Sequence, residues 1–203
     1  MAKKKIIKKA VKKAVKNKKK IKNRIVKMKD EIKIDQLLLH SRQVMLSGVI
    51  DTDTARRVNS HLMALDIHCP RTPIVLWINS RGGSVYDGFA IIDCMNGLSS
   101  PVMTIVNGQA CSMGGIISIF GATRYITKHS VWMAHDMVTG DYDYLTKVKD
   151  RIKNSEKLES TVMKMFIEKT KLTVAELELA RHGELWLDAF ECKQKGVVDE
   201  ILN

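Results

Sequence analysis

Short apolar runs alternate with amphipathic segments from about residue 34 to the end of the chain, and this alternation limits the fold more than any other feature. Runs such as residues 73–78 and 102–106 have the length of single buried strands. Between them, segments such as residues 51–67 repeat apolar residues every three or four positions, which is the spacing of one helix face. This alternation predicts an α/β fold built of βαβ units.

The remaining elements follow from the same spacing and from end signals. The glycine-containing segment at residues 79–83 predicts a turn after the first of these strands. Two helices are expected to open at capping boxes, namely Thr173 with Glu176 and Asp188 with Glu191. Further strands are expected at residues 44–46, 124–126 and 131–134, further helices at 85–92, 112–120 and 142–168, and a helix or strand piece at 37–39.

The positive charge of the chain is confined to its beginning. The formal net charge is +12 over 203 residues, yet residues 1–29 hold 14 Lys, one Arg and no acid. The other 19 basic residues are outnumbered by 22 acidic ones, so residues 30–203 have a net charge of −3. We therefore divide the chain into a basic tail, residues 1–33, and one folded domain, residues 34–203. The high pI says nothing about nucleic-acid binding by that domain.

The tail places apolar residues at helical spacing among its lysines. A basic amphipathic helix of this kind could bind nucleic acid, an anionic surface or an acidic partner through residues 1–29, or could stay a solvated extension. It lacks the apolar core of a secretory signal, and no apolar run of the chain approaches the ~18 residues of a membrane span. The four scattered cysteines fit neither a disulfide scaffold nor a zinc site. We expect a soluble, cytoplasmic protein.

Two glycine-rich segments follow expected strands, and the first reads Ser-Arg-Gly-Gly-Ser at residues 80–84. Glycines at a strand-to-helix connection let the backbone turn sharply and leave amide groups exposed. Neither G-x-G-x-x-G nor Gly-Lys-Ser/Thr is present, so we expect no ATP binding by this chain. The segment could stabilise an oxyanion through its N–H groups, or serve only as a turn.

The second segment, residues 108–115, consists almost wholly of small residues and places Ser112 where a strand passes into a helix. A serine at such a junction can expose its hydroxyl, and we expect the amide of Met113 to point toward the same space. A serine is a weak nucleophile by itself and needs an adjacent base that a third group orients. Cys111 is a rival nucleophile, although small cysteines of this kind are more often part of a core.

The base could come from any of six histidines, and His135 has the most suggestive position. It follows the apolar strand expected at residues 131–134, and α/β sheets place functional groups at the carboxyl ends of their strands. Surface, capping or loop roles suit most of the others, namely His61, His68, His129 and His182.

Together these motifs resemble the proteolytic subunit of the ATP-dependent Clp protease. The matching motifs are Asn-Ser-x-Gly-Gly-Ser at 79–84, Gly-Gln-Ala-x-Ser-Met-Gly at 108–114, a strand that ends in His135, and Gly-Val-Val-Asp at 196–199. The order of the two glycine motifs and the 29-residue separation of Gly83 from Ser112 make the resemblance specific. It covers residues 34–203 and leaves the lysine-rich tail unmatched.

The resemblance implies a serine endopeptidase. Ser112 matches the nucleophile and His135 the general base, while the N–H groups of Gly83 and Met113 match the donors of the oxyanion hole. Glycine-rich oxyanion loops also occur in acyl-CoA-binding enzymes of the related crotonase fold. Those enzymes need no Ser–His pair, so the pair favours the peptidase.

The third position of the triad falls on Glu184. The family has an aspartate there, and the interval from His135 to Glu184 fits the family's register without a gap. A carboxylate one methylene longer can still orient an imidazole. Asp188 is the alternative, although it is better explained as the cap of the next helix.

The resemblance also implies an assembly and its partners. The expected fold is Clp- and crotonase-like, with a protruding handle formed by residues 141–168. Two stacked seven-membered rings would meet through these handles and enclose the sites in a chamber. A separate AAA+ unfoldase, which alone uses ATP, would feed in polypeptides, and the edge at residues 83–85 would receive them as an added strand. For the chain itself we expect no cofactor and no metal.

Four departures from the family pattern stand out. Arg81 stands where the family typically has proline, and it places a flexible cation beside the oxyanion loop. Glu184 replaces aspartate. The tail replaces the N-terminal pore loop, and the docking strand has Val75 where relatives often show an aromatic residue. A catalytically silent regulatory ring subunit and a phage-type head-maturation protease of the same fold are the alternative functions.

Overall fold

The computed structural model describes residues 37–138, 140 and 142–203. The basic tail expected at residues 1–33 lies outside the described residues, as does the amphipathic helix expected within it. The binding roles expected of the tail therefore stay predictions.

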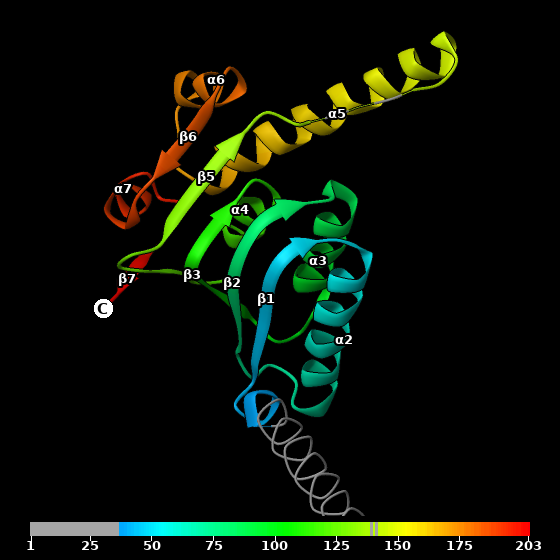
Figure 1. Cartoon of the computed structure of the whole chain (residues 1–203). Helices are drawn as coiled ribbons and strands as arrows, with labels where there is room; N and C mark the ends of the chain where they lie inside the picture. The colour runs from blue at the N-terminus through cyan, green and yellow to red at the C-terminus, as the bar shows by residue number, and fades with distance from the viewer. Residues whose placement is uncertain (1–36, 139, 141) are drawn as a thin grey trace, which may run out of the picture. The chain divides into compact units, whose positions relative to one another are not determined.

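Contacts divide the chain into two compact units, Met1–Ser41 and Arg42–Asn203. In the first unit residues 37–40 are helical, which is one of the two forms expected there. The second unit contains all the strands of the described residues (Figure 1). It also contains the residues of the candidate site.

Seven strands of the described residues form one sheet. Its main path is parallel and runs in the order β1, β2, β3, β4, β7. Strand β5 pairs in parallel with the carboxyl end of β3, and β6 pairs antiparallel with β5. The bounds are β1 Gln43–Ile50, β2 Ile74–Gly83, β3 Val102–Cys111, β4 Arg124–Thr127, β5 Val131–His135, β6 Glu184–Leu187 and β7 Glu200–Leu202. The α/β fold expected from the alternating pattern is confirmed.

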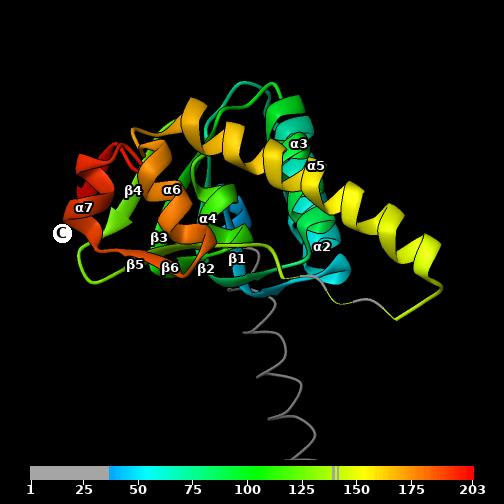
Figure 2. The ribbon, with the colours of Figure 1, turned by 90° about the horizontal axis from the view of Figure 1, so that it is seen from above.

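Six helices of the Arg42–Asn203 unit connect or flank these strands. Helix α2 packs on β1 and α3, while the short α4 packs on β2 and β3. The long helix α5 projects beyond the sheet (Figure 2), so the protruding helix expected at residues 142–168 is confirmed, although it begins at Leu145. The bounds are α2 Thr52–His68, α3 Val85–Gly97, α4 Met113–Ser118, α5 Leu145–Lys169, α6 Val174–Arg181 and α7 Ala189–Gln194. Both expected capping boxes are present, at α6 and at α7.

Strand β2 corrects one expectation, because residues 79–83 are not a turn. The strand continues to Gly83 and keeps pairing with β1 across a register shift after Gly48. Gly82 and Gly83 have φ values of 96° and 152°, so glycine there bends a strand instead of closing a turn. The two glycines correctly predicted an unusual backbone conformation at residues 82 and 83. Local composition could not show that these residues pair with β1 and so remain part of a strand.

The core lies between the parallel strands and the helices that cover them. In β2 the side chains of Ile74, Leu76 and Ile78 are fully buried, as alternation along a strand requires. In α2 the four buried residues are those on the expected apolar face: Ala55, Val58, Leu62 and Leu65. Burial of this apolar surface is the main favourable contribution to folding.

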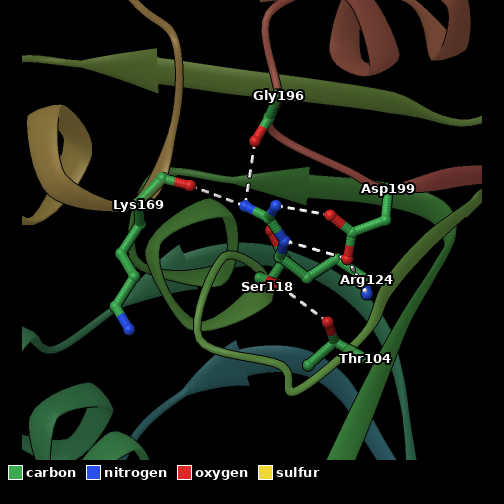
Figure 3. A network of polar contacts seen from close by, with 6 residues as sticks. All are labelled: Thr104, Ser118, Arg124, Lys169, Gly196 and Asp199. Atoms are coloured by element: carbon green, nitrogen blue, oxygen red, sulfur yellow. Dashed lines mark hydrogen bonds and ion pairs between the residues drawn. The ribbon is translucent and has the colours of Figure 1, made fainter.

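A polar network around Arg124 ties the end of α5 to the sheet (Figure 3). Its guanidinium donates to Lys169 O at 2.6 Å and to Gly196 O at 2.9 Å, and it pairs with Asp199. The hydrogen bonds from Arg124 hold the pKa of Asp199 below its usual value. Since Lys169 is the last residue of α5, the network fixes the helix whose inner face reaches the candidate site.

Candidate active site

Ser112 occupies the sharp connection between β3 and α4. Its backbone has φ 54° and ψ −125°, a strained conformation for any residue with a side chain. The Ser112 N–H donates to Met133 O of β5 at 2.8 Å, which holds the connection in place. A serine on such a strand-to-helix turn presents its hydroxyl at the end of the sheet, as in the nucleophile elbow of α/β-hydrolases.

The expected oxyanion loop lies directly against this serine. A Cβ on Gly82 would come 2.7 Å from Ser112 Cβ, and one on Gly83 would come 2.1 Å from Ile50 O. Both positions therefore exclude any side chain. Met113 is the first residue of α4, so its N–H has no partner within the helix. The structure brings Gly83, Ser112 and Met113 to one cleft.

His135 ends β5, as the sequence indicates, and it lines the same cleft. Strand β5 pairs in parallel with residues 109–111 of β3, so His135 and Ser112 follow neighbouring parallel strands at the same end. His135 is half-buried. No other histidine in the described part of the chain lines this cleft.

Glu184 begins β6 and is the antiparallel partner of His135. Residues directly opposite in such a pair have Cβ atoms ~5 Å apart on the same face. The Glu184 carboxylate is exposed, and its Oε2 accepts a hydrogen bond from Trp186 Nε1 at 2.8 Å. Trp186 was not expected to contact the site, although residues two apart on a strand share a face.

Asp188 lies at the other end of β6. The register pairs Leu187 with Trp132, so Asp188 is four positions from Glu184 and roughly 13 Å along the strand. Its Oδ1 accepts from Glu191 N at 2.8 Å, which is the helix cap that the sequence predicts. Glu184 is thus the carboxylate that the fold brings beside His135, and Asp188 is not.

Cys111 has the surroundings of a core residue. Its side chain is buried, and burial, followed by the charge of Glu184, raises the pKa of the thiol. The thiolate is the reactive form of cysteine, so a raised pKa disfavours Cys111 as a nucleophile.

The cleft around Ser112 has a volume of about 350 Å³, in the range of small-molecule and peptide-side-chain sites. Its walls are mainly apolar and include Val162 and Phe166 of α5, which lie too far along the chain for sequence reasoning to place here. Its charged or ionisable lining residues are Arg81, His135 and Asp136.

No hydrogen bond joins Ser112 Oγ to His135, or His135 to Glu184, within the described residues. Catalytic hydrogen bonds are often long in unliganded enzymes and tighten when substrate binds. The described residues also contain no group of three or more His, Cys, Asp or Glu side chains placed to hold a metal, and no helix among them is long and apolar enough to cross a membrane.

Comparison with known proteins agrees with this geometry. The model of the Clp protease family matches residues 26–203. This chain belongs to the Clp protease family. The match includes the whole Arg42–Asn203 unit and begins earlier than the resemblance at residues 34–203, inside the basic segment.

Individual members of the family are similar over most of their length. The ATP-dependent Clp protease proteolytic subunit 1 of Protochlamydia amoebophila is 32% identical over 181 residues, which cover 87% of each chain. The ATP-dependent Clp protease proteolytic subunit 2 of Bacillus licheniformis is 34% identical, over 81% of this chain and 88% of its own length. The corresponding subunit of Streptococcus mutans is 33% identical, over 81% of this chain and 86% of its own length. The family resemblance inferred from the glycine motifs is confirmed.

Proposed function

We propose that this chain is a Clp-type serine endopeptidase that hydrolyses peptide bonds of unfolded polypeptides inside the chamber of an oligomeric ring assembly. One observation carries the proposal: Ser112 and His135 share a cleft with the backbone groups of Gly83 and Met113. A nucleophile, a base and two fixed N–H donors are what acyl transfer requires. The names of the similar proteins support the same activity.

In the proposed mechanism Ser112 Oγ attacks the scissile carbonyl carbon while His135 accepts its proton. The N–H groups of Gly83 and Met113 stabilise the oxyanion that forms. His135 then donates the proton to the leaving amine as the C–N bond breaks, which leaves an acyl ester on Ser112. Water, deprotonated by His135, hydrolyses this ester.

Glu184 is proposed as the group that orients His135 and stabilises its protonated form. The cross-strand pairing of Glu184 with His135 supports this role. The carboxylate must turn from Trp186 Nε1 toward the imidazole, which is one rotamer change of an exposed side chain. Neither a metal nor a cofactor enters these steps.

For the assembly we propose two stacked heptameric rings that meet through α5, fed by a separate AAA+ unfoldase that uses the ATP. Exposed apolar residues at the projecting end of α5, namely Tyr144, Leu145 and Ile152, support burial of this helix against another subunit. Substrate would add as a strand beside residues 83–85. Light scattering should then give a mass near fourteen chains.

We further propose that the protein is cytoplasmic and that residues 1–29 bind nucleic acid or another anionic surface. The 15 positive charges without an acid support the second point. Such binding should weaken steeply with salt and disappear when residues 1–29 are deleted, while peptide hydrolysis survives.

A serine-reactive fluorophosphonate tests the peptidase chemistry directly, because labelling needs an activated nucleophile. We expect labelling of the full-length protein that Ser112→Ala abolishes and His135→Ala greatly slows. Ser47→Ala, on the exposed side of β1, is the matched control and should label normally. Labelling that persists in Ser112→Ala would contradict the proposal.

A further inference from the structure

Arg81 is a cation in the cleft that the proposed reaction does not use. It precedes Gly82, whose backbone packs on Ser112, and it lines the cleft together with Ser112 and His135. Its side chain is exposed at the surface of β2. No hydrogen bond or ion pair engages it within the part of the chain that the structure describes.

The surroundings of Arg81 favour an anionic ligand. Most of the cleft wall is apolar, and low-dielectric walls strengthen the field of a charge that faces the cleft. Asp136, the one carboxylate of the described lining, follows His135 on the β5 side, and its Oδ1 accepts from Met137 N. The β2 side of the cleft is therefore electropositive and the β5 side is not.

The position of Arg81 defines which part of a substrate it can reach. A strand rises ~3.3 Å per residue, so Arg81 stands about 7 Å along β2 from Gly83, the proposed oxyanion donor. A peptide that adds beside residues 83–85, as proposed above, and continues past the scissile bond toward residue 81 brings a side chain one or two residues from that bond near Arg81. A guanidinium matches a carboxylate there with two parallel hydrogen bonds.

We propose that Arg81 makes the cleft selective for polypeptides with an aspartate or glutamate within about two residues of the scissile bond, whose carboxylate it binds as an ion pair. This inference rests on the proposed peptidase function and adds a substrate class to it. Arg81 acts as a specificity-determining residue and takes no part in bond cleavage.

Matched fluorogenic peptides test the proposal with the full-length protein. The two peptides differ only by Glu or Gln near the scissile bond, and mass spectrometry locates the cleavage. We expect kcat/KM to be up to about fivefold higher for the Glu peptide, which is the upper range for an ion pair of an exposed arginine. Arg81→Gln should bring the ratio close to one, and Arg81→Glu should favour a Lys peptide instead.

Two controls separate selectivity from other effects. Arg56→Gln removes an exposed arginine of α2 outside the cleft and should keep the wild-type ratio. Raising the salt concentration should lower the Glu/Gln ratio, because salt screens exposed charges. An unchanged ratio in Arg81→Gln, or an equal loss for both peptides as expected for a residue that stabilises the oxyanion, would overturn the proposal.

Binding distinguishes failure of this proposal from failure of the peptidase function. In Ser112→Ala the labelled peptides bind without cleavage, and fluorescence anisotropy gives their Kd. We expect the Glu peptide to bind up to about fivefold more tightly than the Gln peptide, and the Ser112→Ala, Arg81→Gln double variant to lose the difference. Absence of hydrolysis with this binding difference would reject the peptidase alone, whereas equal Kd values would reject the role of Arg81.

Discussion

The two sides of the candidate site are held in different ways. Ser112 and the glycine loop lie at the ends of β2 and β3, which are buried parallel strands with partners on both sides. Glu184 lies on β6, a four-residue edge strand, and its exposed carboxylate contacts Trp186. Pairing with β1 holds the oxyanion segment, and the hydrogen bond from Ser112 N–H to β5 holds the nucleophile, before substrate arrives, whereas the orienting carboxylate keeps rotamer freedom.

The largest expected effect comes from the nucleophile and its base. Ser112→Ala or His135→Ala should lower the kcat of a small fluorogenic peptide by roughly 10⁵- to 10⁶-fold, as for other serine triads. The double variant should be no worse than either single variant, because the two groups act as one unit. Losses that multiply in the double variant would contradict a shared mechanism.

Glu184 begins the edge strand β6 and Asp188 follows its end, so substitutions of these two carboxylates test that part of the site. Glu184→Gln keeps the size of the side chain and removes its charge, and we expect a fall in kcat of up to ~10⁴-fold with assembly intact. Glu184→Asp should retain activity. Asp188→Asn should instead cost at most ~1 kcal/mol of stability through a weaker helix cap, with kcat nearly unchanged. If Asp188→Asn abolished turnover and Glu184→Gln did not, Asp188 would be the third member of the triad.

Glycine substitution tests how rigid the backbone of the proposed oxyanion segment is. A Cβ at position 83 would lie 2.1 Å from Ile50 O, so Gly83→Ala must move backbone and should destabilise the protein by about 2 kcal/mol or more. It should also reduce kcat by moving an oxyanion donor. Gly97→Ala is the matched control, since nothing lies within 4 Å of its Cβ. Denaturant unfolding and peptide turnover measure the two effects.

The ion pair between Arg124 and Asp199, which helps to anchor the end of α5, predicts that the stability of the fold depends on pH. The Asp199 pKa is lowered by the side chain of Arg124, so the ion pair stabilises the fold above the ordinary Asp pKa of 3.8 and is lost as the pH falls through the folded-state value. Asp199→Asn should cost at most ~1 kcal/mol at pH 7, because the carboxylate is 38% exposed. The difference from wild type should shrink toward pH 2 in urea titrations.

The smallest expected effect concerns Trp186. Trp186→Phe removes the N–H that competes with His135 for Glu184, so we expect kcat to rise by about two- to threefold, the equivalent of a weak exposed hydrogen bond. Trp77→Phe loses a comparable bond, to Gln43 Oε1, and should leave kcat unchanged. A fall in kcat for Trp186→Phe would instead mean that Trp186 holds Glu184 in its working position.

The sequence by itself determined the order of the helices and of the first five strands, the caps at Thr173 and Asp188, and the positions of Ser112 and His135 at strand ends, but it did not predict β6 and β7. These features are local, because side-chain spacing and end signals act within a few residues.

Only the tertiary structure decided that β2 runs on through Gly83, that Glu184 rather than Asp188 lies opposite His135, and that Arg81 faces the cleft unpaired. Each of these depends on the register between strands far apart in the chain, and a shift of one residue in that register turns every side chain to the other face. Local spacing carries no information about that register, so the family resemblance, not periodicity, identified Glu184 in advance.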